Sequence, residues 1–215
     1  MKNQLLEKHL DLVIEANKIH NITRIESREK GILLHIEDSL SALPEIQEAP
    51  EGPYADLGSG AGYPGIPLAI ETNRETVLVE SVGKKARLLE EFIKELELNN
   101  VSVYSGRIED LSKEQGKRFS VVTARALSSL PSLIELASPL LKMDGLLICY
   151  KAHVDEEEKE HACSLEKKLG MALKSVREFT LSDNETYRTI YVFQKVAKPK
   201  VHLPRKSGQA QKNPY

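Results

Sequence analysis

A glycine-rich loop constrains the fold of this chain more than any other feature. The loop lies within YADLGSGAGYPGIPLAI, residues 54–70, and its glycines are Gly58, Gly60, Gly62 and Gly65. Glycine loses more backbone entropy on folding than other residues, so glycines this dense serve unusual backbone angles or the close approach of a ligand. A short apolar strand precedes the loop, and Pro67 suits the start of a helix after it. The stretch therefore predicts a strand–loop–helix unit that presents bare backbone to a ligand.

Strands and helices alternate along the rest of the chain. The expected strands cover residues 54–58, 76–80, 101–104, 119–126 and 145–151. The expected helices cover residues 66–71, 84–98, 128–142 and 155–170. This alternation predicts an α/β fold with a parallel sheet and right-handed crossovers. Two further strand patterns, at 172–181 and 187–196, predict a closing antiparallel hairpin.

Four segments are expected along the 215 residues, which suit one domain with a small appendage. They are an N-terminal helical extension (1–43), a proline-rich linker (44–53), a ligand-binding domain (54–197) and a basic C-terminal tail (198–215). Charged residues interrupt the apolar positions of residues 1–20, and no apolar run is long enough to span a membrane. The two cysteines form no CxxC motif. These features predict a reduced, cytoplasmic protein without membrane association.

The charge of the chain is distributed unevenly. The sequence has 30 lysines and arginines and 32 acidic residues. No acid follows Glu185, whereas seven basic residues do. An acidic body with a basic end is typical of a protein that meets a polyanion at one edge, and a solvated tail is the alternative.

Several polar segments converge on one edge of the predicted sheet. The glycine loop, Glu80, GRIED at 106–110 and ARA at 124–126 all follow strands, and ligands bind at the carboxyl ends of parallel strands. Glu80 lies 20 residues after Gly60, where a carboxylate can accept hydrogen bonds from two ribose hydroxyls. The pattern predicts a nucleoside-containing cofactor, either NAD or S-adenosylmethionine.

Asp56 and two prolines favour S-adenosylmethionine over NAD. Asp56 lies two residues before Gly58, where its charge would repel a pyrophosphate but suit a cationic ligand tail. Pro64 and Pro67 lack the backbone N–H groups that a pyrophosphate would bind at a helix start. We therefore predict that Asp56 binds the cofactor. For both Asp56 and Glu80, a capping or surface acid is the alternative.

Five motifs together resemble those of one bacterial methyltransferase family. They are DLGSGAGYPGIPLAI (56–70), VLVES followed by KKARLLEE (77–91), RIED (107–110), TARAL (123–127) and PRKSGQAQKNPY (204–215). NIT (21–23) and HIEDSL (35–40) extend the resemblance to nearly the whole chain. The chain is similar to the 16S ribosomal RNA guanine-N7 methyltransferases called ribosomal small-subunit methyltransferase G, or glucose-inhibited division protein B. The resemblance implies a Rossmann-like class I methyltransferase fold, S-adenosylmethionine as cofactor, and 16S ribosomal RNA or the small ribosomal subunit as partner.

The resemblance also implies roles for individual cofactor-site residues. The backbone of Gly58 and Gly60 would lie against the cofactor with Tyr63 beside it, Glu80 would face the ribose, Ile108 and Glu109 would frame the adenine, and Arg125 would lie on the substrate side of the cofactor pocket. Two positions depart from the family pattern. Tyr63 stands where phenylalanine is common, and Ala152 follows Lys151 where glycine is common.

The RNA is expected to meet basic residues at the pocket and in the tail. The expected contacts are Arg125, Lys151, Arg205, Lys206 and Lys212. The last three lie on a flexible segment with glycine and proline and are expected to bind RNA phosphates. For Arg125, an ion pair with Glu109 or Asp110 is the alternative.

The chemistry of guanine N7 requires few catalytic groups. N7 is an unprotonated acceptor on the major-groove edge, so its methylation needs no general base. The enzyme has to hold nitrogen, methyl group and sulfur in line and exclude water. We therefore name no catalytic residue, and the histidines form no nucleophilic or metal-binding pattern. The alternatives are an NAD-dependent oxidoreductase and a non-catalytic RNA-binding protein with a vestigial pocket. We expect a monomer.

Overall fold

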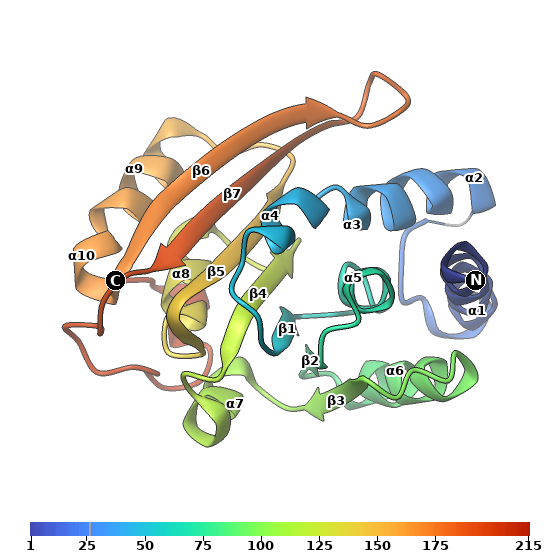
Figure 1. Cartoon of the computed structure of the whole chain (residues 1–215), viewed down its shortest axis with the longest axis horizontal. Helices are drawn as coiled ribbons and strands as arrows, with labels where there is room; N and C mark the ends of the chain where they lie inside the picture. Colours follow the sequence, from blue (N-terminus) through green and yellow to red (C-terminus); the bar gives the residue numbers. More distant parts are fainter. Residues whose placement is uncertain (26) are drawn as a thin grey trace.

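A single, mostly parallel sheet runs through the centre of the molecule in the computed structural model, which describes residues 1–25 and 27–215 (Figure 1). Its strands are β1 (Tyr54–Leu57), β2 (Thr76–Glu80), β3 (Val101–Ser105), β4 (Phe119–Arg125), β5 (Leu141–Lys151), β6 (Met171–Thr180) and β7 (Tyr187–Lys195). Their spatial order is β3-β2-β1-β4-β5-β7-β6, and β7 runs antiparallel to both β5 and β6. The predicted α/β fold with a C-terminal antiparallel hairpin is thus confirmed.

Helices cover both faces of this sheet (Figure 1). In the described residues they are α1 (Lys2–His20), α2 (Arg28–Gly31), the π-helix η1 (Ile32–Glu37), α3 (Asp38–Leu40), α4 (Leu43–Gln47), α5 (Gly65–Thr72), α6 (Gly83–Glu95), α7 (Ile108–Gln115), α8 (Leu130–Ala137), α9 (Glu156–Ser164), α10 (Glu166–Leu169) and α11 (Gln209–Lys212). On one face, Leu6 and Val13 of α1 share a buried cluster with Ile66 and Phe92. The N-terminal helical extension therefore belongs to the same folded body as the sheet.

Several elements differ from their expected extents. The second half of the N-terminal helical extension is divided by the π-helix, and α4 begins at its end and extends into the segment expected to be a linker. The helix expected over 128–142 ends at Ala137, and β5 begins at Leu141, because Pro139 cannot continue the helical hydrogen bonds. Helix α7 was not expected. It follows β3 directly and begins with Ile108 and Glu109.

The strand register aligns the carboxyl ends of the parallel strands at one edge. Leu57 pairs with Val79 on β2 and with Ala124 on β4, and Arg125 pairs with Tyr150 on β5. The loops after these strands therefore meet in one region, which is where α/β sheets bind ligands. Within the described part of the chain, no helix is both long and apolar enough to cross a membrane.

Candidate functional site

The glycine loop adopts the left-handed backbone that its glycines permit. Gly58 and Gly60 have φ values of +70° and +57°. The Gly58 N–H donates to Val79 O at 2.8 Å, which fixes the loop on β2. A Cβ added at Gly60 would meet no atom closer than Gly58 O at 3.8 Å, so the outer side of Gly60 is open to a ligand. The loop thus offers bare, anchored backbone, as the sequence predicted.

Glu80 joins this loop to the next helix. Its carboxylate accepts hydrogen bonds from the Gly60 N–H at 3.0 Å and from the Val82 N–H at 2.8 Å. Glu80 is 6% exposed, at the end of β2. Each carboxylate oxygen has a second lone pair, so the group can accept two further hydrogen bonds from hydroxyls while it holds the loop.

A narrow cleft of about 40 Å³ lies between the glycine loop and the start of α7. It is lined by Gly58, Val79, Ser81, Gly106, Arg107, Ile108, Glu109, Leu127, Leu136 and Gln211. The structure therefore brings Gly58 together with Ile108 and Glu109, as the resemblance implied. Leu127, Leu136 and Gln211 were not assigned from the sequence. The first follows β4, the second lies on α8, and the third lies on α11 near the C-terminus.

Asp56 does not face the cleft, and the expectation that its carboxylate contacts a ligand does not fit this geometry. The side chain is fully buried, with Oδ1 accepting from the Thr123 hydroxyl at 2.7 Å and Oδ2 accepting from the Gly65 N–H at 3.2 Å. Burial raises the pKa of this carboxyl group. Asp56 lies inside β1, and it ties β4 and the first turn of α5 to that strand.

Tyr63 also turns inward, where it packs against two histidines. Its ring stacks on His35 with centroids 4.2 Å apart and contacts the ring of His9 at 4.4 Å. Tyr63 is 4% exposed and its hydroxyl has no hydrogen-bond partner among the described residues. Burial lowers the pKa of both His9 and His35 to about 3, so both imidazoles are neutral at pH 7. The predicted position of Tyr63 beside the cofactor remains a prediction.

Arg125 is held by the N-terminal extension. The guanidinium donates to Leu34 O at 3.0 Å and pairs with Asp38 at 2.9 Å, with a further contact to His35 Nδ1 at 3.5 Å. Leu34 and His35 lie in the π-helix, a conformation that occurs often at functional sites.

The alternative pairing of Arg125 with Glu109 or Asp110 is wrong. Glu109 accepts from the Gly208 N–H, and Asp110 pairs with Lys113. The partner is instead Asp38, because the loops after β4 face the N-terminal helices.

A second, larger cavity of about 400 Å³ opens beside the narrow cleft. It is lined by Ile25, Leu34, His35, Asp38, Arg125, Ala126, Ser128, Leu133, Tyr150, Lys151, Ala152 and Arg188. Asp38 is 3% exposed and bridges Arg125 to the Arg188 Nε at 3.0 Å. Lys151 pairs with Glu158 at 2.7 Å and donates to Ser128 O at 3.1 Å. The lining therefore carries three basic side chains, which Asp38 and Glu158 only partly neutralise, and the single excess positive charge suits an anionic ligand.

Asp38 and Arg188 were missed by the sequence reasoning. HIEDSL was part of the family resemblance, but it gave no role to Asp38. Arg188 lies near the start of β7, between Tyr187 and Thr189, and the strand also contains Lys195, so no local pattern distinguished Arg188.

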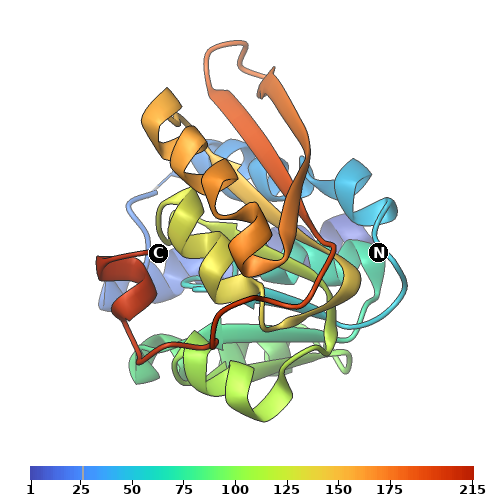
Figure 2. The same ribbon diagram turned by 90° about the vertical axis from the view of Figure 1, so that its left-hand side faces the viewer.

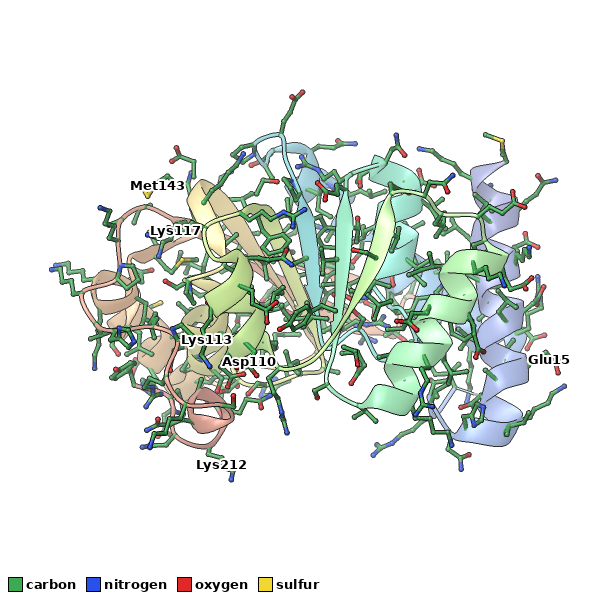
Figure 3. The ribbon with its side chains drawn as sticks, turned by 90° about the horizontal axis from the view of Figure 1, so that it is seen from below. Glu15, Asp110, Lys113, Lys117, Met143 and Lys212 are labelled. Atoms are coloured by element: carbon green, nitrogen blue, oxygen red, sulfur yellow. The ribbon has the colours of Figure 1, made fainter. Side chains whose placement is uncertain are left out.

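The basic residues of the tail have different environments. Arg205 forms a double hydrogen bond with Glu135, with both donor–acceptor distances at 2.6 Å, and its side chain is 13% exposed. Lys206 and Lys212 are exposed. Figure 3 shows Lys212 pointing away from the body of the molecule, at its lower edge and at the end opposite Glu15. The expectation that Arg205 lies on a flexible segment and is free for phosphates does not fit its position, because a buried carboxylate already binds it.

The chain is similar to known proteins over most of its length. A family model described as rRNA small subunit methyltransferase G matches residues 2–187. A ribosomal RNA small subunit methyltransferase G from Geobacillus kaustophilus is 37% identical over 97% of this chain and 89% of its own. One of the same name from Lachnoclostridium phytofermentans is 36% identical, over 99% and 90%. Among solved structures, an O-methyltransferase from Bacillus cereus in complex with SAH has a TM-score of 0.62 and 19% identity, covering 87% of this chain and 91% of its own.

Proposed function

The chain belongs to the rRNA small subunit methyltransferase G family, and from this premise we propose that it transfers a methyl group from S-adenosylmethionine to guanine N7 of 16S ribosomal RNA. The observation that carries the proposal is the pair of adjoining sites at the end of β4. Leu127 lines the narrow cleft, whereas Arg125, Ala126 and Ser128 line the larger basic cavity. Ligands bound in these two sites would both contact the segment 125–128, which would bring them close to each other.

The residue types around the narrow cleft suit S-adenosylmethionine, and the cleft, at about 40 Å³, has to widen to admit the whole cofactor. When bound, this cofactor supplies a methyl group on a positively charged sulfur. Gly60 and Glu80 are not in the cleft lining but lie next to its lining residues Gly58, Val79 and Ser81, where Gly60 offers open backbone and Glu80 keeps lone pairs for the ribose hydroxyls. Ile108 and Glu109 line the cleft and form the wall for the adenine. The prolines at the start of α5 lack the N–H groups that would hold a pyrophosphate, which disfavours NAD.

The larger cavity suits a nucleotide of the RNA. Its volume of about 400 Å³ falls in the range of small-molecule sites, and its mixed apolar and basic lining suits a base that carries a phosphate. Arg125 is fixed in place by Leu34 O and Asp38, so its orientation is set before any substrate arrives. Guanine N7 carries no proton, and the role of these groups is therefore to position the base and exclude water rather than to remove a proton.

The RNA backbone would contact basic groups around this cavity. Arg125, Lys151 and Arg188 lie at the cavity. The exposed Lys206 and Lys212 add positive charge on the C-terminal segment. Guanine N7 is inaccessible in the deep, narrow groove of an A-form helix, so the target base has to lie in a loop or be turned out. We further propose that the protein acts as a monomer in the cytoplasm, where such an RNA is assembled into ribosomes.

A ligand titration and a transfer assay test the proposal together. S-adenosylmethionine and NAD are titrated separately into the full-length protein, and label from methyl-labelled S-adenosylmethionine is then followed into 16S ribosomal RNA, with transfer RNA as the control substrate. We expect binding of S-adenosylmethionine alone and label in 16S ribosomal RNA alone. Binding of NAD instead would favour the oxidoreductase, and binding without any transfer would favour the non-catalytic RNA-binding protein.

A further inference from the structure

The C-terminal segment, residues 198–215, is folded against the body of the protein. After β7 the chain crosses the face that carries α8 and ends in the short helix α11 (Figure 2). Tyr215 packs against the hydrophobic cluster on this face. The segment that the sequence suggested as a flexible basic tail is therefore part of the fold, and its contacts lead to the narrow cleft.

Glu135 of α8 anchors the segment at two points. Its carboxylate is bound by the Nε and a terminal nitrogen of Arg205, each at 2.6 Å, and it also accepts from the Tyr215 N–H at 3.2 Å. Glu135 is 2% exposed, so this double hydrogen bond is shielded from water. The Arg205 guanidinium in turn lies 4.1 Å from the centre of the Tyr215 ring. Such a buried, bidentate pair fixes the backbone on either side of it.

Between these anchors the segment reaches the narrow cleft. The Gly208 N–H donates to Glu109 Oε1 at 2.6 Å, and Gln211 lines the cleft together with Gly58 and Ile108. Glu109 Oε2 receives no hydrogen bond from the described residues. The Gly208 contact thus holds one oxygen of Glu109 and leaves the other for a donor on a ligand.

We propose that the C-terminal segment forms part of the S-adenosylmethionine site, with Gly208 orienting Glu109 and Gln211 closing the outer side of the cleft. This inference rests on the proposed function, because it concerns the cofactor of that same reaction. Arg205 acts as a positioning residue: it touches Glu135, and through Glu135 it sets where Gly208 and Gln211 lie. Its charge is already paired, so its contribution is to the cofactor site rather than to an RNA phosphate.

Two substitutions in the full-length chain test this arrangement. Arg205→Lys keeps the charge but loses the planar double hydrogen bond, and Gln211→Ala removes the side chain that lines the cleft. Gln209→Ala is the matched control, since it makes the same change on the same helix at an exposed residue outside the cleft lining.

Calorimetry with S-adenosylmethionine gives the first measurement. Loss of the double hydrogen bond to Glu135 releases the segment and predicts a Kd that rises about tenfold in Arg205→Lys. Loss of the side chain that lines the cleft predicts a rise of about threefold in Gln211→Ala, and Gln209→Ala should show no change. Thermal unfolding without ligand shows whether each variant is folded at the assay temperature. Gln211 is exposed, so Gln211→Ala should stay folded. Its Kd therefore tests the inference even if Arg205→Lys is unstable.

Amide hydrogen exchange gives a second, independent measurement. Saturating S-adenosylmethionine should slow exchange in residues 205–215 of the unmodified protein and leave exchange in the hairpin turn at 181–186 unchanged. Unchanged exchange in 205–215, or folded variants with the Kd of the unmodified chain, would overturn this inference and leave the proposed function standing. Failure of the unmodified chain to bind S-adenosylmethionine would instead overturn the proposed function itself.

Discussion

At the scale of single residues, Glu80 connects the glycine loop to the segment before α6. It accepts one N–H from the glycine loop and one from the start of the segment that leads into α6. Its position was predictable, because an acid at the end of the second strand recurs in nucleoside-binding α/β folds. Its two backbone contacts were not predictable, since they depend on how the loop and β2 fold together. Glu80 therefore shapes the loop and remains available to a ligand.

Replacing Glu80 with glutamine should weaken cofactor binding without unfolding the protein. Glutamine has one acceptor oxygen, so one backbone N–H loses its partner and the ribose loses a charged acceptor, at a cost of about 1.5–3 kcal/mol in binding free energy. Calorimetry with S-adenosylmethionine measures the change, and Glu90→Gln on the exposed side of α6 is the control. Equal affinity in the two variants would remove Glu80 from the site.

The buried histidines predict that the fold is less stable in acid. His9 and His35 have their pKa lowered from 6.5 to about 3 in the folded state, chiefly by burial. Below pH 6.5 the unfolded chain binds protons that the folded chain does not, so stability is complete above that pH and is lost as the pH falls toward 3. Each histidine contributes a slope of about 1.4 kcal/mol per pH unit in this window.

His9→Phe tests this pH dependence, because the ring remains and the titrating group is removed. Urea unfolding between pH 7 and pH 4 should show a slope shallower by about 1.4 kcal/mol per pH unit in the variant. Identical slopes in the variant and the unmodified protein would mean that His9 is not held neutral by burial.

At the scale of elements, local patterns predicted the regular units and missed those that depend on packing. The strands and the helix α6 follow from apolar periodicity, and α5 follows from its glycine and proline positions. The π-helix did not, because its widened turn is adopted where Leu34 O and His35 meet Arg125. Helix α7 was also missed, since its residues are mostly polar and its apolar positions Ile108 and Leu111 are few.

Gly65, the last glycine of the loop, should be required for the packing of α5 on the sheet. A Cβ at Gly65 would lie 2.4 Å from Leu78 Cδ2, whereas a Cβ at Gly83 would meet nothing within 4 Å. Gly65→Ala should therefore lower the free energy of unfolding by about 1–3 kcal/mol through overpacking. Gly83→Ala should leave it unchanged or raise it by about 0.4–1 kcal/mol. Urea denaturation compares them, and equal stabilities would contradict the close packing.

At the scale of the whole molecule, the two ends of the chain complete the site. Asp38 of the N-terminal extension binds Arg125, 87 residues later, and Gly208 binds Glu109, 99 residues earlier. The sequence predicted that Arg125 and Glu109 lie at the same edge of the sheet, because each comes at or just after the carboxyl end of a parallel strand. It could not predict their partners, because contacts over such separations follow from tertiary packing and leave no local pattern.

Asp38→Asn should impair the larger cavity, where the substrate is expected, and leave the narrow cofactor cleft unaffected. Both Arg125 and Arg188 would lose their carboxylate partner in a largely buried place, which should cost about 3 kcal/mol in stability. Methyl transfer should fall, while S-adenosylmethionine affinity is retained because Asp38 lines only the larger cavity. Asp110→Asn is the control, since its pair with Lys113 is exposed (Figure 3). Loss of cofactor affinity in Asp38→Asn, with transfer intact, would reverse this assignment.

The most direct test of the whole account is the position of the methyl group on the RNA. Small ribosomal subunits and free 16S ribosomal RNA are each incubated with the full-length protein and S-adenosylmethionine, and then treated with borohydride and aniline, which cleave RNA chains at N7-methylguanine. We predict cleavage at a guanine that depends on both protein and cofactor and is reduced in Glu80→Gln. Methylation at another atom, or none on either substrate by a protein that binds the cofactor, would contradict the claim that this chain is a guanine-N7 methyltransferase.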